Sequence, residues 1–298
     1  MRSRLVLSSV LGVSEQYVDM SRQMLLYYRQ WPISEFVLTL NGSEGEIWSF
    51  RQFLRDAGIP ATVFTATVRY DNRLQARWSQ QRQSYIQHQY AAHDWKLCVD
   101  SDEIVERSDA LLRVLDTTCC SYFLAFTVDM VPIASADETP SHVQVFDRPH
   151  VMCFLTQAYA LAQKVPLARA HVLVGGAAHD VARRYRALPR YEHVLPLYHY
   201  KWEAGVRTRL RERFEHYRRL GLPYAWESLL LCTLLDEGIK HLHVDDLDHV
   251  RLSIKPDKTG DVSLQIDPAG HLTFFSASGE AGRAQGPALS CSKSTRSA

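Results

Sequence analysis

The sequence predicts an α/β fold built around a mainly parallel sheet. In the first 120 residues, short runs rich in Val, Leu and Ile alternate with longer amphipathic stretches. This β-α-β-α order is typical of parallel strands joined by right-handed helical crossovers. With 298 residues, 46% of them hydrophobic and 22% charged, the chain can form one large globular domain or two small ones.

The elements of the first half follow from their boundary signals. Ser14, before a periodic apolar stretch, can cap a helix that Pro32 ends. Ser43 and Glu46 have the spacing of a capping box, and Gly58 ends the helix that they begin. The strands are expected at residues 5–11, 36–40, 61–68 and 96–100. The helices are expected at about residues 14–31, 43–57, 74–92 and 108–115.

The second half of the sequence is less regular. Strands are expected at residues 122–131, 170–175 and 194–200, and helices at about 203–220 and 224–237. Gly175-Gly176 predicts a tight loop whose backbone closely approaches another segment. Residues 251–277 are expected to form a C-terminal extension. Residues 278–298 contain few large apolar side chains, so we expect a disordered tail there.

Composition excludes several classes of function. A net charge of +1 provides no field for nonspecific nucleic-acid binding, and we expect no nucleic-acid partner. In the arginine-rich stretch 207–219, Glu212 and Glu215 are interleaved, which is typical of a solvated helix face. No run approaches the ~20 apolar residues of a transmembrane helix. The six cysteines lack paired metal-ligand spacing, which favours buried thiols in a reducing compartment. We therefore expect a cytoplasmic protein without a transmembrane segment.

A cluster of acids follows the fourth expected strand. Asp100, Asp102 and Glu103 come directly after the apolar run 96–99. Alternate residues of a strand share a face, so Asp100 and Asp102 point the same way if the extended geometry continues. Two carboxylates suit Mg²⁺ or Mn²⁺, whose other ligands are water and phosphate oxygens. Ligands bind beyond the carboxyl ends of parallel strands, where these acids are expected. A solvated acidic turn is the alternative interpretation.

Four segments carry, in order, a resemblance to a known family. They are Arg82-Gln83, Asp94-Trp-Lys-Leu-Cys-Val-Asp-Ser-Asp-Glu103, Gly175-Gly-Ala-Ala-His179 and Pro196-Leu-Tyr-His-Tyr-Lys-Trp202. The chain resembles glycosyltransferases of the GT-A fold, especially the family-2-like group, over about residues 4–237. The resemblance implies a GT-A domain at 1–250, with a donor half at about 1–120 and an acceptor half at about 121–250. The sequence departs from the family at Gln83, where relatives carry Asn, and at Asn41-Gly42, where many carry an acid and Ser.

The resemblance implies a metal-dependent hexosyltransferase that moves a sugar from a nucleotide-sugar donor, with UDP as the expected carrier. The acceptor could be a glycan, a lipid-linked glycan, a small molecule or a protein. The cation, Mn²⁺ or Mg²⁺, would bridge the diphosphate oxygens and stabilise the charge released as the glycosidic bond breaks. Its implied ligands are Asp100, Asp102, His199 and His179. The implied donor contacts are Asp71, Arg82, Asp100, Ser101 and Lys201.

Some roles stay open in the sequence. An inverting transferase needs a carboxylate base, and Asp180 and Glu227 are the leading choices in the acceptor half. His199 could instead be a core histidine, and Asp71 could simply form a turn. Arg82 could be an exposed helix charge. A nucleotidyl- or phosphotransferase would use the same acids on a triphosphate, and a non-catalytic protein that binds sugar nucleotides or glycans could keep the fold.

Overall fold

The computed structural model describes residues 3–132, 146, 150–153, 163–176, 178–201, 206–221, 252–253, 262–266 and 272–276. Contacts divide the chain into two compact units, Met1–Ile239 and Lys240–Ala298. In the second unit, β10 (Leu252–Ser253), β11 (Val262–Ile266) and β12 (Leu272–Ser276) form an antiparallel sheet. The expected helix at 224–237 and the expected tail at 278–298 lie outside the described residues.

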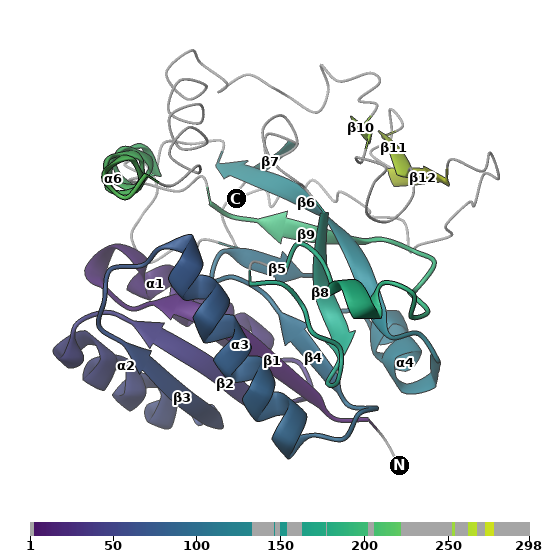
Figure 1. Ribbon diagram of the computed structural model, residues 1–298, viewed down its shortest axis with the longest axis horizontal. Coiled ribbons are helices and arrows are strands. Elements are labelled where there is room, and N and C mark those ends of the chain that lie inside the picture. The colour runs from purple at the N-terminus through teal and green to yellow at the C-terminus, as the bar shows by residue number, and fades with distance from the viewer. Residues whose placement is uncertain are drawn as a thin grey trace, which may run out of the picture. The chain divides into compact units, whose positions relative to one another are not determined.

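The first unit combines a large sheet with flanking helices (Figure 1). Its strands are β1 (Leu5–Gly12), β2 (Ile33–Asn41), β3 (Ala61–Ala66), β4 (Trp95–Cys98), β5 (Glu103–Val105), β6 (Tyr122–Pro132), β7 (His150–Cys153), β8 (Gln163–Arg169) and β9 (Leu195–His199). Its helices are α1 (Glu15–Tyr28), α2 (Glu44–Asp56), α3 (Asn72–Gln89), α4 (Asp109–Thr117) and α6 (Val206–Arg219), with a short 3-10 helix at Arg183–Tyr185. The predicted α/β class is confirmed.

The sheet has a parallel half and a mixed half. Its strand order is β3-β2-β1-β4-β8-β6-β9-β5, with β7 paired to β6. Strands β3, β2, β1 and β4 run parallel, as the β-α-β-α pattern predicts. In the second half β8 is antiparallel to β4 and β6, while β6 and β9 are parallel to each other. The carboxyl ends of β1 to β4 therefore meet at one edge, beside strands that arrive from the second half.

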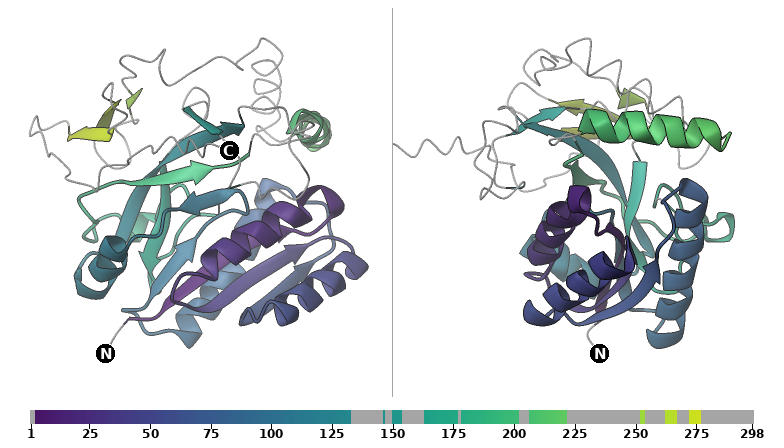
Figure 2. Two further views of the ribbon diagram at one scale, coloured as in Figure 1. Left: turned by 180° about the vertical axis from the view of Figure 1, so that it is seen from behind. Right: turned by 90° about the vertical axis from the view of Figure 1, so that its left-hand side faces the viewer.

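The alternation of side chains along β1 determines which helices cover each face. Leu5, Leu7 and Leu11 belong to the main core cluster, which also contains side chains of α1 and α2. Val6 packs on the other face with Ile86 of α3. The right-hand view of Figure 2 shows α1 and α2 on one side of these strands and α3 on the other. Two-sided burial explains why these strands are nearly continuous apolar runs.

Local signals account for several helix ends and one close approach. Ser43 and Glu46 form the predicted capping box, with Glu46 Oε2 accepting from Ser43 N at 2.7 Å. Gly58 has φ of +62°, a conformation that favours glycine. A Cβ on Gly176 would lie 2.8 Å from Ala76 Cα, so glycine lets this loop contact the backbone of α3. The close approach predicted for the Gly-Gly segment is confirmed.

Two strand predictions need correction. The expected strand at 170–175 is wrong, because the strand in that region, β8, ends at Arg169. Residues 170–175 instead form turns and bends that include an isolated bridge between Val174 and Val181. The expected strand through Asp100 ends early, at Cys98, and β5 begins only at Glu103. The acids therefore lie on the connection between two strands.

Candidate active site at an acidic turn

The acidic segment is a tight turn held by its own hydrogen bonds. Glu103 N donates to the Asp100 carbonyl oxygen at 3.2 Å, and Asp100 N donates to Glu103 Oε2 at 2.9 Å. Tyr200 N, just after β9, donates to the Asp102 carbonyl oxygen at 2.7 Å. The extended geometry expected for Asp100 and Asp102 is thus replaced by a turn. Glu103 holds the turn through a side chain that is only 2% exposed.

This turn joins two strands that are far apart in the sheet. Three strands, β8, β6 and β9, separate β4 from β5 in the sheet order, although only four residues separate them in sequence. The sheet therefore curls so that the short turn can connect its two sides (Figure 1). Each of the three intervening strands contributes one ionisable side chain to the cluster around the turn: Lys164, Asp129 and His199.

Lys164 of β8 forms the first ionic arm. Its Nζ lies 2.8 Å from Glu103 Oε1 and 3.4 Å from Asp100 Oδ2. Burial disfavours the Lys164 ammonium, but Glu103 and Asp100 outweigh this effect and raise the pKa of Lys164. The pKa of Asp100 is also raised, because burial and the neighbouring Glu103 and Asp102 charges outweigh the attraction of Lys164. The Asp100 side chain is still 36% exposed, so a ligand can reach it.

His199 of β9 forms the second ionic arm. Its Nε2 lies 3.4 Å from Asp102 Oδ2, and its Nδ1 lies 3.2 Å from Asp129 Oδ1. Burial disfavours the imidazolium, but Asp102 and Asp129 raise the pKa of His199 to about 9. For Asp102, burial is outweighed by His199 and then Lys201, which lower its pKa. A protonated ring suits a phosphate oxygen and must lose its Nε2 proton before it can coordinate a cation.

Register explains how three of these side chains meet. Glu103 pairs with His199 between β5 and β9, and His199 pairs with Asp129 between β9 and β6. Directly paired residues present their side chains on the same face of a sheet. Lys164 pairs with Ala125, four residues before Asp129 on β6, which places it on that same face. The sheet therefore delivers the ionic groups to one side, beneath the acidic turn.

The donor contacts expected from the first half lie in different surroundings. Arg82 is buried, not an exposed helix charge: it donates to Ser8 Oγ at 3.0 Å and Thr39 Oγ1 at 2.8 Å. Burial, opposed by Cys98 and Asp100, lowers the pKa of Arg82 to about 10. Asp71 caps α3 by accepting from the backbone N–H groups of residues 73 and 74. Ser101 lies on the acidic turn itself. Their donor contacts stay predictions.

Gln83, the residue after Arg82, is buried, and its side chain forms hydrogen bonds within the protein. Its Nε2 donates to Ser79 Oγ at 2.9 Å and to the Val174 carbonyl oxygen at 2.6 Å. Its Oε1 accepts from Val174 N and from the buried Lys96 Nζ. Lys96 also donates to the Val172 carbonyl oxygen. Gln83 therefore connects α3 to the 170–175 segment and to Lys96 of β4.

The contacts given for Asp180, and for the loop that carries His179, are with parts of the protein other than the acidic turn. Asp180 Oδ2 lies 2.5 Å from an Nη atom of Arg186, in an ion pair. His179 lies on the loop 175–180, which Val165 N ties to β8 through the Ala178 carbonyl oxygen at 2.5 Å. Glu227 lies outside the described residues. The roles of all three stay predictions.

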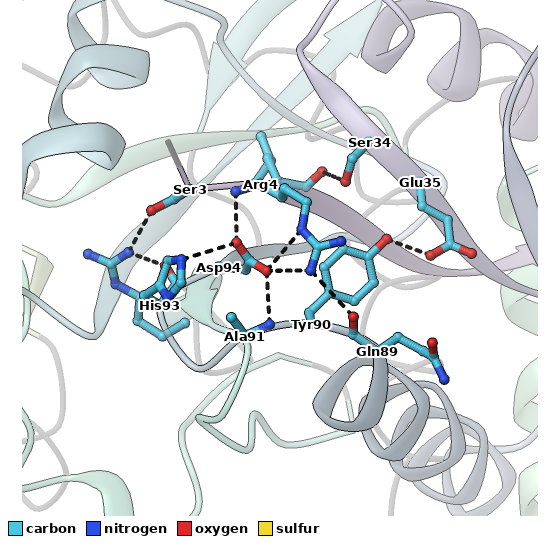
Figure 3. Close-up of polar contacts among 11 residues, drawn as sticks. Ser3, Arg4, Ser34, Glu35, Gln89, Tyr90, Ala91, His93 and Asp94 are labelled. Carbon is cyan, nitrogen blue, oxygen red and sulfur yellow. Dashed lines mark hydrogen bonds and ion pairs between the residues drawn. The ribbon is translucent and has the colours of Figure 1, made fainter. Parts of the chain in front are cut away.

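Asp94, at the start of the acidic motif, serves the opposite edge of the sheet. Its carboxylate accepts from the Arg4 backbone N at 2.9 Å, from the Arg4 guanidinium at 2.8 Å and from Ala91 N at 2.9 Å (Figure 3). Arg4 also stacks on the Tyr90 ring at 4.4 Å. These contacts close the loop before β4 onto the start of β1. Asp94 therefore has a structural role at one end of the motif, and the partly exposed Asp100 and Asp102 lie at the other end.

The basic helix α6 contacts Lys201, which follows β9, and Tyr17 of α1. Arg209 donates to the Lys201 carbonyl oxygen at 3.3 Å and lies 5.8 Å from the centre of the Tyr17 ring. Leu210 and Tyr217 are buried. Arg218 forms an exposed pair with Glu215 at 2.9 Å, as expected for a solvated face. One side of the helix thus packs on the protein while another side faces solvent.

The acidic turn exposes two carboxylates, Asp100 and Asp102, in part. Among the described residues, no group of three or more His, Cys, Asp or Glu side chains is arranged to hold a metal ion. Asp102 is 29% exposed and offers oxygen ligands, which Mg²⁺ and Mn²⁺ prefer, with water and phosphate completing the shell. A cavity of about 490 Å³ lies elsewhere, lined by residues such as Trp31, Arg107 and Arg113 and by none of the acidic turn.

Comparisons with known proteins show similarity of fold alone. No protein-family model matches the chain, and no curated protein matches it significantly. A crystal structure of 4-diphosphocytidyl-2C-methyl-D-erythritol synthase is 13% identical with a TM-score of 0.32, covering 57% of this chain and 76% of that one. The inositol-1-phosphate CTP transferase from T. maritima is 10% identical (TM-score 0.29; 44% and 55% covered). A mycobacterial protein is 12% identical (TM-score 0.34; 74% and 76% covered). Such TM-scores carry no argument about activity.

Sequence reasoning missed Lys164 and Asp129. Asp129 carries a detectable signal, because it is a single acid inside the apolar run of β6, and buried carboxylates require a partner. Lys164 belongs to a strand that also contains Pro166 and Arg169 and was not expected at all.

Of the described residues, no helix is long and apolar enough to cross a membrane.

Proposed function

We propose that the protein is a divalent-cation-dependent glycosyltransferase that uses a nucleotide-sugar donor, with UDP as the expected carrier. The observation that supports this proposal is the acidic turn: two partly exposed carboxylates, Asp100 and Asp102, at the carboxyl edge of a parallel half-sheet. Both carboxylates also form ion pairs, Asp100 with Lys164 and Asp102 with His199, and the buried Glu103 holds the turn that presents them. The proposal also uses the resemblance of the 94–103 motif to GT-A glycosyltransferases.

The residues have separate tasks in this proposal. Asp102 would hold the cation directly, and Asp100 would hold a cation-bound water or the ribose. Bound there, the cation would act as a Lewis acid that neutralises the departing diphosphate. His199 presents its Nε2 hydrogen to the same space and suits a diphosphate oxygen. Lys201, close enough to lower the pKa of Asp102, adds positive charge for the same anion.

The proposed general base is Asp180 or Glu227. Asp180 is engaged by Arg186, so it could accept an acceptor proton only after that pair opens. Glu227 remains the other candidate. The expectation that the anomeric configuration of the sugar is inverted comes from the resemblance alone. The acceptor would be identified from the glycosylated product. The acceptors to be tested are a glycan, a lipid-linked glycan, a small molecule and a protein.

The test is a donor-hydrolysis assay with product identification. The protein is incubated with Mn²⁺ and a panel of UDP-, GDP-, CDP- and dTDP-sugars, and nucleotides are separated by chromatography. Slow release of a nucleoside diphosphate from one donor supports sugar transfer. Absence of release, together with a donor-dependent rise in melting temperature, indicates a binding protein and contradicts the proposal. Omission of the metal and addition of EDTA serve as controls.

Nucleotidyl transfer is the second candidate, and a specific feature of the site favours it. Three cationic side chains, Lys164, His199 and Lys201, surround the acidic turn. A triphosphate carries more negative charge than a diphosphate ester and would use more of these groups. The same protein is therefore incubated with each nucleoside triphosphate, Mg²⁺ and sugar phosphates or polyol phosphates. Release of pyrophosphate, in place of a nucleoside diphosphate from a sugar donor, would assign this activity.

A further inference from the structure

We infer that Asp129 is a positioning residue that orients His199 toward the acidic turn. This inference deepens the proposed function and rests on it for the role of His199. Asp129 is 0% exposed and is the single charged residue of β6. A buried carboxylate without a partner is strongly unfavourable, so its position needs a compensating contact. His199 Nδ1, at 3.2 Å from Asp129 Oδ1, supplies one such contact.

The strand register makes this pairing a property of the fold. Asp129 and His199 are direct partners on the parallel strands β6 and β9. Their side chains therefore leave the sheet on one face at the same level, without depending on a loop conformation. Both strands continue through buried neighbours, among them Val128 and Leu197, which restrict sliding of one strand along the other.

The pairing determines which ring nitrogen faces the acids. With Nδ1 directed at Asp129, the opposite nitrogen, Nε2, lies 3.4 Å from Asp102 Oδ2. A ring flip would place carbon atoms against both carboxylates and lose both contacts. A carboxylate that fixes a histidine in this way controls its ring orientation and the nitrogen available to a ligand. Asp129 itself is fully buried and acts through His199, not on the substrate.

The chemical consequence is a donor site with a preset hydrogen-bonding atom. Nε2 of His199 is presented beside Asp102, where the proposed diphosphate and cation would lie. A fixed imidazole binds a phosphate oxygen without first losing rotational freedom. Loss of Asp129 should therefore weaken binding of UDP with Mn²⁺ by about ten- to a hundredfold, the usual effect of removing such an orienting partner.

The first test observes the His199 ring directly. Protein labelled with ¹⁵N-histidine gives long-range ¹H–¹⁵N spectra, and the His199 signals are those absent from His199→Gln. In Asp129→Asn, which keeps the side-chain shape but removes the charge, we expect the His199 nitrogen shifts to change and its Nδ1 proton to exchange faster. Asp94→Asn is the matched control, since Asp94 is also a buried carboxylate but lies beside the starts of β1 and β4. It should leave the His199 signals in place.

The second test is a double-mutant cycle on binding of UDP with Mn²⁺, measured by calorimetry. Asp129→Asn should weaken binding in the native background and have no further effect in His199→Gln. If His199 signals are unchanged in folded Asp129→Asn, or if the two effects on binding are additive, the inference is wrong. If the native protein binds no UDP at all, the donor proposal fails, and the spectra still decide whether Asp129 orients His199. Should Asp129→Asn not fold, Asp129→Glu, which keeps the charge but displaces it, is compared in the same spectra.

Discussion

Lys164 Nζ lies 2.8 Å from Glu103 Oε1 and 3.4 Å from Asp100 Oδ2, so an ammonium group from β8 joins the two ends of the acidic turn. Glu103 is nearly fully buried and also accepts from Asp100 N. The three residues form one network in which the buried Lys164 ammonium stabilises the turn that presents Asp100 to solvent. Any ligand cation at Asp100 must share that carboxylate with Lys164.

Replacing Lys164 with methionine should destabilise the protein by about 3–5 kcal/mol, because Glu103 would remain buried without its partner. The measurement is urea unfolding followed by circular dichroism at pH 7. The double variant Lys164→Met/Glu103→Gln should recover a large part of the loss, since it removes both charges. A double variant as unstable as the single one would show that the ion pair is not the cause.

Replacing Asp102 with asparagine should abolish most turnover while the protein stays folded. The side chain is partly exposed, and an asparagine amide can still accept from His199, so we expect the fold to persist while loss of the proposed cation ligand decreases kcat/KM by about two to three orders of magnitude. Asp19→Asn, an exposed acid on α1, is the control and should behave like the native protein. Near-native activity of Asp102→Asn, with an unchanged circular dichroism spectrum, would exclude Asp102 as the cation ligand.

Asp94 should make stability depend on pH in the acidic range. Burial alone would raise the pKa of Asp94, but hydrogen bonds from Arg4 and Ala91 lower it below the ordinary value. A lowered folded-state pKa means that Asp94 contributes its full stabilisation above the unfolded-state pKa of about 3.9 and loses it as pH falls further. The difference in unfolding free energy between the native protein and Asp94→Asn should therefore be constant from pH 7 to 5 and decrease below pH 4. A difference that grows on acidification would contradict this.

Gly176→Ala should destabilise the loop that packs on α3. The added Cβ would lie 2.8 Å from Ala76 Cα, so one of the two backbones must move, at a cost of about 1–3 kcal/mol. The matched control is Gly45→Ala in α2, where no atom lies within 4 Å of the added Cβ. That substitution should be neutral or stabilise by up to about 1 kcal/mol. Equal melting temperatures for the two variants would show that the loop does not pack as described.

The parallel half of the fold was predictable from local signals. Capping residues such as Ser43, breakers such as Gly58 and the apolar runs of β1 to β4 act within a few residues of each other. They therefore specify these elements without knowledge of the rest of the chain. The acids were found in the same way, because three carboxylates directly after an apolar run are conspicuous in the sequence, although Glu103 proves to be buried. His199 was found through a motif and not through its surroundings.

The remainder of the site depends on contacts that are distant in sequence. Lys164 meets Glu103 and Asp129 meets His199 only because β8, β6 and β9 lie between β4 and β5. No periodicity within either segment encodes that order. The turn at Asp100 was also mispredicted, since the hydrogen bond from Asp100 N to Glu103 Oε2 competes with extended pairing and wins. Asp180 was chosen from the sequence because it is adjacent to His179, whereas in the structure its carboxylate forms an ion pair with Arg186.

The most direct test of the central claim is a crystal of the protein soaked in UDP and MnCl₂, measured at a wavelength where manganese scatters anomalously. We predict one strong anomalous peak at about 2.0–2.2 Å from a carboxylate oxygen of Asp102 and next to the diphosphate of UDP. A phosphate oxygen of that UDP should lie within hydrogen-bonding distance of His199. An anomalous peak and a nucleotide located away from the acidic turn would contradict the account.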